Sequence, residues 1–371
     1  MSCQFDIAII GGGPAGTSVA ISLSRLGYSV ALFDKSEYNT IRFGETLQPE
    51  AQKLLIHLGV WERFLSDNPA QSFGIQSAWG QDALYENSYI FNPFGHGWHL
   101  NRVRFDTMLV HAAEKVGALV LQGAKLIQCL ESAKGEWDLS ILIKDKVHQF
   151  QSRFLVDATG RSSFIARKKG AKRILSDHLI GVVAFFHTRK QKSIHTGYTL
   201  IEAQEGGWWY SAELPECKTA LAFMTDADIY AHALRRSSNF WQEQLKASVY
   251  TKARFVSSNT SSNPKPIASY SARMDSVAGA NWLAVGDAAM SFDPLSSQGI
   301  YKAIESGIRA TKLIHSKFIN KRNRLESYSN SLDNAFEKYL HLRRLYYLKE
   351  QRWPESSFWK RRHLSLATQY P

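Results

Sequence analysis

Three glycines and one acid near the start of the chain have the types and spacing that bind a diphosphate. Gly11, Gly13 and Gly16 follow the apolar run 6–10 at G-x-G-x-x-G spacing, and Asp34 closes the next apolar run. Gly11 permits a tight turn, Gly13 lets backbone approach a pyrophosphate, and Gly16 lets a helix pack closely on a strand. The phosphates would lie at the helix N-terminus, and Asp34 would accept a hydrogen bond from a ribose hydroxyl. The pattern predicts a dinucleotide site.

Two further motifs follow apolar runs later in the chain. Asp157 and Gly160 end a run in mid-chain, and Gly286 and Asp287 end another, with the turn-rich segment 294–300 behind it. We expect each run to be a buried parallel strand that leads into a turn. Three motifs in this order argue against a plain NAD-binding protein with chance glycine repeats.

In their order and separation these motifs resemble the FAD-dependent monooxygenases of the para-hydroxybenzoate hydroxylase superfamily. The resemblance implies that Asp287 accepts from a ribityl hydroxyl, that Asp157 and Gly160 shape a turn beneath FAD, and that 294–299 stabilises charge on the reduced ring. Arg102 resembles the family's arginine at a helix start near the cofactor phosphates. Molecular oxygen would be the co-substrate, and NAD(P)H or another donor the reductant. The residues predicted to bind FAD are Gly11, Gly13, Pro14, Ala15, Gly16, Asp34, Lys35, Arg42, Glu45, Thr46, Arg102, Asp157, Gly160, Gly286, Asp287, Pro294, Gln298, Gly299 and Ile300.

Two strings resemble the branch of this superfamily that includes the flavin-dependent halogenases. They are Gly44–Pro49, which reads GETLQP, and Gly207–Pro215, which reads GWWYSAELP. The halogenase signature has tryptophans where this chain has Tyr210 and Ala212. The catalytic lysine of halogenases follows the Gly-Glu helix, and residues 67–100 contain no lysine. This absence argues against halogenation.

Further strings, 77–80, 92–102 and 358–362, resemble the flavoproteins that mature tryptophylquinone enzymes, the partners of lysine ε-oxidase, glycine oxidase and quinohemoprotein amine dehydrogenase. The resemblance covers nearly the whole chain. It implies that the substrate is a tryptophan side chain in the precursor of a quinone-cofactor oxidase or dehydrogenase. Two alternatives stay open: a small-molecule hydroxylase or halogenase, and a non-catalytic flavoprotein that chaperones a partner.

The predicted catalytic residues are Glu45, His96, His99 and Asp293. The two histidines would manage protons, or they are ordinary loop histidines with backbone partners. Glu45 would act in the site or hydrogen-bond backbone near the flavin. Asp293 would carry a charge near the flavin or cap a turn.

The element pattern predicts an α/β fold with an α+β insert. A Rossmann-like FAD-binding domain would comprise residues 1–177, with a loop and hairpin insert at about 67–101, and the return segment 276–320. An antiparallel-sheet substrate domain, 178–275, would be inserted into it, and 321–371 would be a helical C-terminal region. Helical spacing of apolar residues predicts helices at 47–66, 102–116, 226–250 and 297–318.

Composition limits the classes of function. The 371 residues carry a net charge of +12 and three scattered cysteines, which suggest neither a disulfide framework nor a metal site. We expect a cytoplasmic protein, without a nucleic-acid motif and without an apolar run of membrane-spanning length. The basic last 70 positions predict a solvated helical surface or a docking face for an acidic protein. Oligomeric state is left open.

Overall fold

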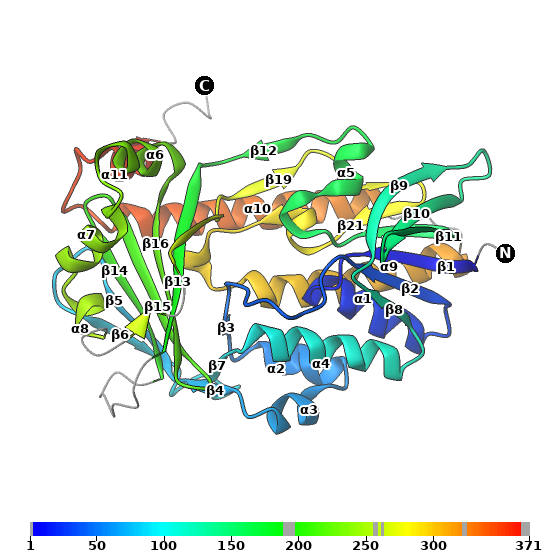
Figure 1. Ribbon diagram of the computed structural model, residues 1–371, viewed down its shortest axis with the longest axis horizontal. Helices are drawn as coiled ribbons and strands as arrows, with labels where there is room; N and C mark the ends of the chain where they lie inside the picture. Colours follow the sequence, from blue (N-terminus) through cyan, green and yellow to red (C-terminus); the bar gives the residue numbers. More distant parts are fainter. Residues whose placement is uncertain (1–2, 188–196, 255–258, 261–262, 321–324, 365–371) are drawn as a thin grey trace.

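The computed structural model describes residues 3–187, 197–254, 259–260, 263–320 and 325–364. Its two largest sheets lie at opposite ends of the molecule (Figure 1). The first has eight strands and the central order β20-β21-β11-β1-β2-β8, extended from β11 by β10 and β9. Its strands are β1 (Cys3–Ile10), β2 (Val30–Asp34), β8 (Leu119–Gln122), β9 (Lys125–Glu131), β10 (Trp137–Ile143), β11 (Lys146–Asp157), β20 (Ala278–Gly279) and β21 (Trp282–Ala284).

The centre of the first sheet is parallel and fully covered. β1 pairs in parallel with both β2 and β11, and β2 is buried along its whole length. Strands covered on both faces read as continuous apolar runs, which is why these segments were recognisable in the sequence. The helix α1 (Pro14–Arg25) packs against both α4 (Arg102–Lys115) and α9 (Gly299–Asn320). The carboxyl ends of β1, β11 and β21 therefore open toward the second sheet.

The second sheet also has eight strands, in the order β17-β13-β16-β15-β14-β5-β6, with β18 beside β13. All pairs are antiparallel except β14 with β5. Trp241 covers one face against Phe186 and Trp209, and Tyr347 with Trp359 covers the other. The strands are β5 (Gly74–Ala78), β6 (Tyr85–Ser88), β13 (Leu179–His187), β14 (Tyr198–Gln204), β15 (Gly207–Leu214), β16 (Lys218–Asp226), β17 (Asn259–Thr260) and β18 (Lys265–Ala268).

Short elements join the two large sheets. Two three-stranded sheets have the orders β3-β7-β4 and β12-β19-β22. Their strands are β3 (Thr46–Leu47), β4 (Ala70–Ser72), β7 (Gly97–His99), β12 (Arg173–Leu175), β19 (Ala272–Met274) and β22 (Met290–Ser291). The remaining helices are α2 (Ala51–His57), α3 (Trp61–Ser66), α5 (Phe164–Lys168), α6 (Ala227–Arg236), α7 (Phe240–Ala247), α8 (Tyr250–Ala253), α10 (Leu325–Leu348) and α11 (Ser357–Leu364), with 3-10 turns η1 (Gly160–Ser162), η2 (Gly286–Ala288) and η3 (Pro294–Ser296).

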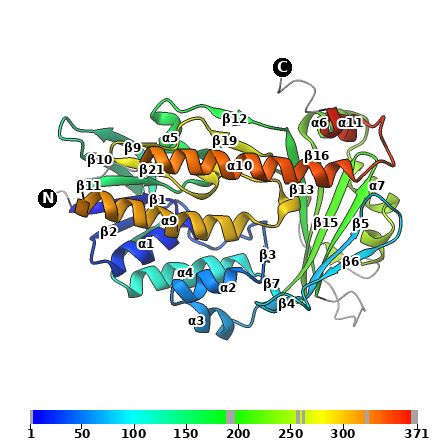
Figure 2. The ribbon, with the colours of Figure 1, turned by 180° about the vertical axis from the view of Figure 1, so that it is seen from behind.

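The C-terminal helices tie the two sheets together. α10 contacts β20 of the first sheet and α11 beside the second, and Figure 2 shows it crossing the length of the molecule. In α11, Phe358 and Trp359 are fully buried, and the Trp359 indole donates to the Gln204 carbonyl at 2.9 Å. Within the described ranges, no helix combines the length and the apolar character needed to cross a membrane.

Several sequence-based element boundaries are wrong. The helix expected at 47–66 is strand β3 followed by α2 and α3, which are separated at Gly59, where φ is +59°. The helix expected at 226–250 is divided into α6 and α7, because Ser237 adopts an extended conformation. Periodicity alone did not reveal either interruption. The insert at 67–101 also contributes β5 and β6 to the second sheet, a long-range pairing that no local pattern encodes.

Candidate functional site

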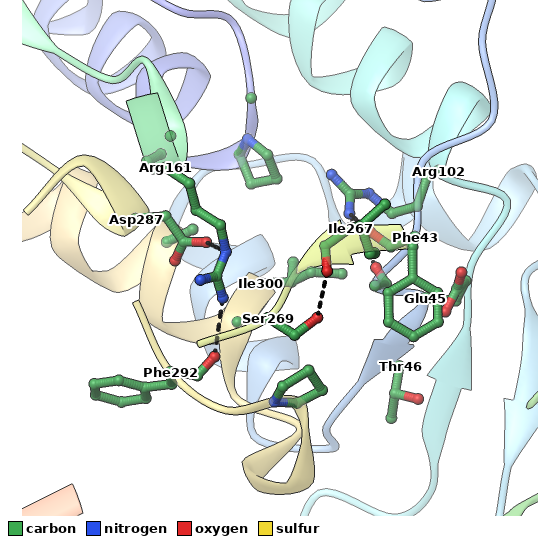
Figure 3. Close-up of a pocket in the computed structure, with 18 of the residues that line it drawn as sticks. Phe43, Glu45, Thr46, Arg102, Arg161, Ile267, Ser269, Asp287, Phe292 and Ile300 are labelled. Carbon is green, nitrogen blue, oxygen red and sulfur yellow. Dashed lines mark hydrogen bonds and ion pairs between the residues drawn. The ribbon is translucent and has the colours of Figure 1, made fainter. Parts of the chain in front are cut away.

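A cavity of about 310 Å³ lies where the carboxyl ends of the first sheet face the second sheet (Figure 3). Arg161 and Asp287 stand at one side of it, and Phe43, Glu45 and Thr46 at the other. The predicted residues that line it are Gly13, Pro14, Ala15, Glu45, Thr46, Arg102, Gly160, Asp287, Asp293, Pro294, Gly299 and Ile300. The predicted residues outside its lining are Gly11, Gly16, Asp34, Lys35, Arg42, His96, His99, Asp157, Gly286 and Gln298.

The glycine turn has the shape that a diphosphate needs. A Cβ on Gly16 would collide with the Gly11 carbonyl oxygen, and one on Gly11 with the Ala158 carbonyl, so both glycines allow close packing. A Cβ on Gly13 would meet nothing within 4 Å. Gly13 has no side chain with which to cap α1, and Gly13, Pro14 and Ala15 line the cavity, so the N-terminus of the helix lies at the cavity. An anion fits there because those groups carry partial positive charge.

Asp34 stabilises this turn through hydrogen bonds to its backbone and to neighbouring residues. Its Oδ2 accepts from the Gly12 N–H at 2.6 Å and from the Tyr38 hydroxyl at 3.2 Å, and its Oδ1 accepts from the Ser36 N–H at 2.7 Å. These bonds fix the loop that follows β1. The ribose contact stays a prediction, and Lys35 beside it is exposed.

Asp157 shapes the second turn through backbone hydrogen bonds. Its Oδ2 accepts from the N–H groups of Ile165 and Ala166, at 2.8 and 2.9 Å, and its Oδ1 accepts from Thr159. The carboxylate therefore holds the start of α5. Gly160 follows with φ +62° and lines the cavity, so side-chain and backbone geometry together open this wall.

Asp287 presents a carboxylate to the cavity between two cations. The Lys302 ammonium lies 2.9 Å from Oδ1, and the Arg161 Nε lies 3.5 Å from Oδ2. Burial alone would raise the pKa of Asp287, but Lys302 and Arg161 outweigh it and lower the pKa below its usual value. An ionised acceptor thus stands where a ribityl hydroxyl is expected.

Glu45 is the buried acid of the opposite wall. It is 1% exposed, and its Oε2 lies 3.4 Å from the Tyr210 hydroxyl, which also contacts the Thr46 hydroxyl at 2.7 Å. In the described part of the chain, no side chain hydrogen-bonds its Oε1. Burial raises the pKa of Glu45 to about 7, although the nearby Arg102 opposes the shift. A carboxyl with such a pKa can hold or release a proton near neutral pH.

Arg102 braces the segment that carries Glu45. Its guanidinium donates to the Gly44 carbonyl at 2.9 Å and pairs with Asp106 at 3.0 Å, and Arg42 lies 3.3 Å from the same carboxylate. The side chain lines the cavity while fixing the backbone at the turn before β3.

The structure does not bring the two predicted histidines to the cavity. His99, on β7, is fully buried with Nε2 2.9 Å from the Thr199 hydroxyl, and burial lowers its pKa to about 4. His96 has Nδ1 2.9 Å from the Gly97 carbonyl, and its ring lies edge-on to Trp98. Neither residue lines the cavity, so their proton role stays a prediction.

Asp293 caps a turn, which is one of its two predicted roles, and its charge near the flavin stays a prediction. Its Oδ1 accepts from the Leu295 N–H at 2.9 Å and so caps η3, while its Oδ2 accepts from Tyr347 at 2.7 Å and Arg343 at 3.2 Å. The residue also lines the cavity. Burial raises its pKa despite the Arg343 charge.

Two cations beside Asp287, Arg161 and Lys302, were not among the predicted site residues. Arg161 donates to the Tyr270 and Phe292 carbonyls at 2.7 and 3.1 Å and holds the loop on which η3 lies. The sequence feature that could have identified Arg161 is its position directly after Gly160 of the second motif. Lys302 is 4% exposed, and its signal was a lysine in the first turn of an apolar helix.

The comparisons with known proteins agree with this geometry. A model of the FAD binding domain family matches residues 4–340. The chain is 29% identical over 372 residues to LodB, a putative FAD-dependent oxidoreductase of Marinomonas mediterranea, and the match covers 99% of each protein. It is 26% identical over 320 residues to a 1H-pyrrole-2-carbonyl (peptidyl-carrier protein) brominase of Pseudoalteromonas luteoviolacea, covering 84% of this chain and 77% of that one.

Solved structures show the same fold. The flavin-dependent halogenase CmlS superposes with a TM-score of 0.87 at 23% identity, covering 98% of this chain and 68% of that one. The peptidyl tryptophan dihydroxylase QhpG, described as essential for tryptophylquinone cofactor biogenesis, superposes with a TM-score of 0.78 at 22% identity, covering 97% and 79%. The open N-terminus of α1, the carboxylate of Asp287 and these matches lead to one conclusion: the chain belongs to the FAD binding domain family and is an FAD-dependent oxidoreductase with the fold of the flavin-dependent halogenases.

Proposed function

We propose that this chain is a monooxygenase that hydroxylates the indole ring of a tryptophan in a partner precursor protein, as a step in building a tryptophylquinone cofactor. Three sequence strings resemble maturation flavoproteins of this kind. Likeness in fold to QhpG, a peptidyl tryptophan dihydroxylase, supports the same class of substrate.

The observation that carries the proposal is the chemistry of the cavity wall. Glu45 supplies a buried carboxyl whose Oε1 has no side-chain partner in the described part of the chain. Within those same residues, the lining contains no lysine, the neighbouring Lys302 ammonium is paired with Asp287, and residues 67–100 contain no lysine in the sequence. A halogenase needs an amine to hold hypohalous acid, whereas hydroxylation of an electron-rich ring needs only an acceptor for the ring proton. The wall therefore favours hydroxylation.

When bound, reduced FAD supplies the oxygen-transfer chemistry together with molecular oxygen. The N-terminus of α1 binds the diphosphate, and the N-terminus of α9, which lines the cavity at Gly299, stabilises negative charge beside the ring. Glu45 accepts at Oε1 the proton that the ring carbon releases. Tyr210, edge-on to Phe43 at 5.4 Å, holds Glu45 through Oε2 and keeps water from this wall.

A small-molecule hydroxylase or halogenase is the second candidate, favoured by the identity to the brominase. The two candidates differ in the size of their substrate. A precursor protein must present its tryptophan side chain to the cavity, whereas a free aromatic molecule enters alone.

Mass spectrometry of the precursor tests the proposal. The FAD-loaded protein is incubated with a reductant, oxygen and the precursor of a quinone-cofactor oxidase or dehydrogenase from the same organism. We expect one or two oxygen atoms on a tryptophan and no turnover of free tryptophan. Turnover of a free small molecule with an unchanged precursor would establish the second candidate instead. Flavin reduction without any oxygenated product would favour a non-catalytic chaperone.

A further inference from the structure

The first cavity, which Asp293 lines, is called the flavin cavity below. A second cavity, of about 380 Å³, lies behind Asp293 and is lined by its partners Arg343 and Tyr347. It is lined by the link between β12 and β13, the end of β16, the last turns of α10, and α11, and it opens to solvent. These elements meet where α10 passes the second sheet beside α11 (Figure 2). We call it the arginine cavity because its lining includes Arg343, Arg344, Arg361 and Arg362.

The two acids of this lining are already saturated. Asp226 accepts from Arg362 at 2.7 Å and from Arg361 at 3.1 Å. Asp177 accepts from Arg343 at 2.9 Å and from two backbone N–H groups. Neither carboxylate has an oxygen left without a donor, so the acids do not account for the rest of the lining.

Donors without acceptors remain. The Arg344 guanidinium makes no hydrogen bond or ion pair among the described residues, and its Nε is buried. The Ser176 hydroxyl and the rings of His178 and His341 line the same cavity and have no hydrogen-bond partner in the described ranges. Arg362, 6% exposed, also has a buried Nε without a partner there. Of these groups, the Nε atoms of Arg344 and Arg362 are buried, and a buried donor loses free energy unless an acceptor meets it, whereas His178 and His341 are exposed.

We infer that the arginine cavity binds a small phosphate- or carboxylate-bearing molecule, anchored by Arg344, and that its occupancy acts through Arg343 and Tyr347 on Asp293 in the wall of the flavin cavity. A planar guanidinium with surrounding hydroxyl and imidazole donors matches the several oxygens of such an anion. The volume accommodates a small molecule, and the cavity is lined by the link between β12 and β13, the end of β16, α10 and α11.

The coupling has a direct structural route. Arg343 and Tyr347 line the arginine cavity, and both also contact Oδ2 of Asp293, at 3.2 and 2.7 Å. Asp293 caps η3, the turn that follows the Phe292 backbone and precedes the N-terminus of α9. An anion that draws Arg343 toward the arginine cavity changes the charge balance at Asp293, and so biases the loop beside the flavin. This inference does not rest on the proposed reaction.

Calorimetry tests the binding step. The FAD-loaded protein is titrated with inorganic phosphate and, separately, with succinate, at constant ionic strength. We expect saturable binding of one anion, and the preferred one identifies the ligand as a phosphate or a carboxylate. Arg344→Ala should weaken that binding at least about tenfold, because a charge-assisted hydrogen bond is lost. Lys115→Ala, which removes an exposed charge from α4, should leave it unchanged. Equal affinity in Arg344→Ala, or no binding of either anion, would overturn the site.

The visible spectrum of the flavin tests the coupling. The preferred anion should shift the flavin absorption of the wild-type protein. Tyr347→Phe removes the hydroxyl that reaches Asp293 and should reduce the shift, while calorimetry still records binding. A spectrum that does not respond to the bound anion, or a shift unchanged in Tyr347→Phe, would contradict the route through Asp293.

Discussion

At the scale of single residues, the function depends on the environment of Glu45 more than on its type. The sequence placed this acid in a string that resembles the halogenase branch, and left open whether it acts in the site. The structure buries it beside Tyr210 with Oε1 free of side-chain partners in the described ranges. Burial raises its pKa to about 7, which suits proton transfer at physiological pH.

Two pH dependences of opposite sign follow for Glu45. Turnover should rise about tenfold per pH unit below pH 7 and level off above it, because the carboxylate accepts the ring proton. Stability should fall as pH rises from about 4.5 to 7, since the folded state holds a proton that the unfolded state has already released. That loss amounts to about 3 kcal/mol.

Glu45→Gln is the matched variant for both measurements. It should lower kcat by a factor on the order of 10² to 10⁴, flatten the pH–rate profile near 7, and remove the fall in unfolding free energy across the same interval. Chemical denaturation at several pH values and stopped-flow turnover record the two effects. A Glu45→Gln protein with wild-type kcat and an unchanged profile would show that Glu45 is not the proton acceptor.

At the scale of elements, two glycines of the turn between β1 and α1 have different roles. Gly16 allows the helix to pack on the strand, and Gly13 leaves space for the cofactor. Gly16 is required because the Gly11 carbonyl lies where its Cβ would be. Gly13 has open space in the same position, and an ordinary backbone φ of −73°. The two glycines therefore serve different purposes, although the motif alone makes them look alike.

Substituting each glycine by alanine distinguishes those purposes. Gly13→Ala should leave the melting temperature of the FAD-free protein nearly unchanged and weaken FAD binding at least about tenfold, since the methyl group enters the phosphate space. Gly16→Ala should lower the melting temperature even without FAD, because helix and strand must separate. Fluorescence titration with FAD and thermal unfolding measure both. Wild-type FAD affinity in Gly13→Ala would contradict the assigned position of the diphosphate.

The helix α11 offers a second prediction at this scale. Trp359 is fully buried against the second sheet and donates to Gln204, so Trp359→Ala should reduce the unfolding free energy by about 3–5 kcal/mol. Lys360→Ala, on the exposed side of the same helix, should change it by less than about 0.5 kcal/mol. Urea denaturation compares the two. Equal stability of both variants would show that α11 does not fasten the C-terminal region to the sheet.

At the scale of the whole molecule, local sequence patterns predicted the cofactor motifs. The set of residues that line the site depends on contacts between segments far apart in the sequence. The three motifs led to FAD because each follows a buried strand, and the fold class they implied is the one observed. Arg161 escaped prediction because its partner Asp287 is distant in sequence, and Lys302 because an amphipathic helix commonly carries an exposed lysine there rather than a buried one. The parallel pairing of β5 with β14 escaped for the same reason.

The burial of His99 could not be predicted from the sequence. His96 and His99 lie in a glycine- and tryptophan-rich string, and the sequence allowed them either to manage protons or to be ordinary loop histidines. In the structure His99 belongs to a strand and its ring is fully buried, so burial rather than residue type determines its protonation. Burial of this kind depends on β3, β4 and the second sheet together, and no single segment carries that information.

The most direct test of the proposed reaction uses ¹⁸O₂. The FAD-loaded protein, a reductant and the precursor protein are mixed under labelled oxygen, with bromide and chloride present, and the precursor is analysed by peptide mass spectrometry. We expect one or two ¹⁸O atoms on a single tryptophan, and their loss in Glu45→Gln. A halogenated tryptophan, or a precursor without label in the presence of a turning-over flavin, would contradict it.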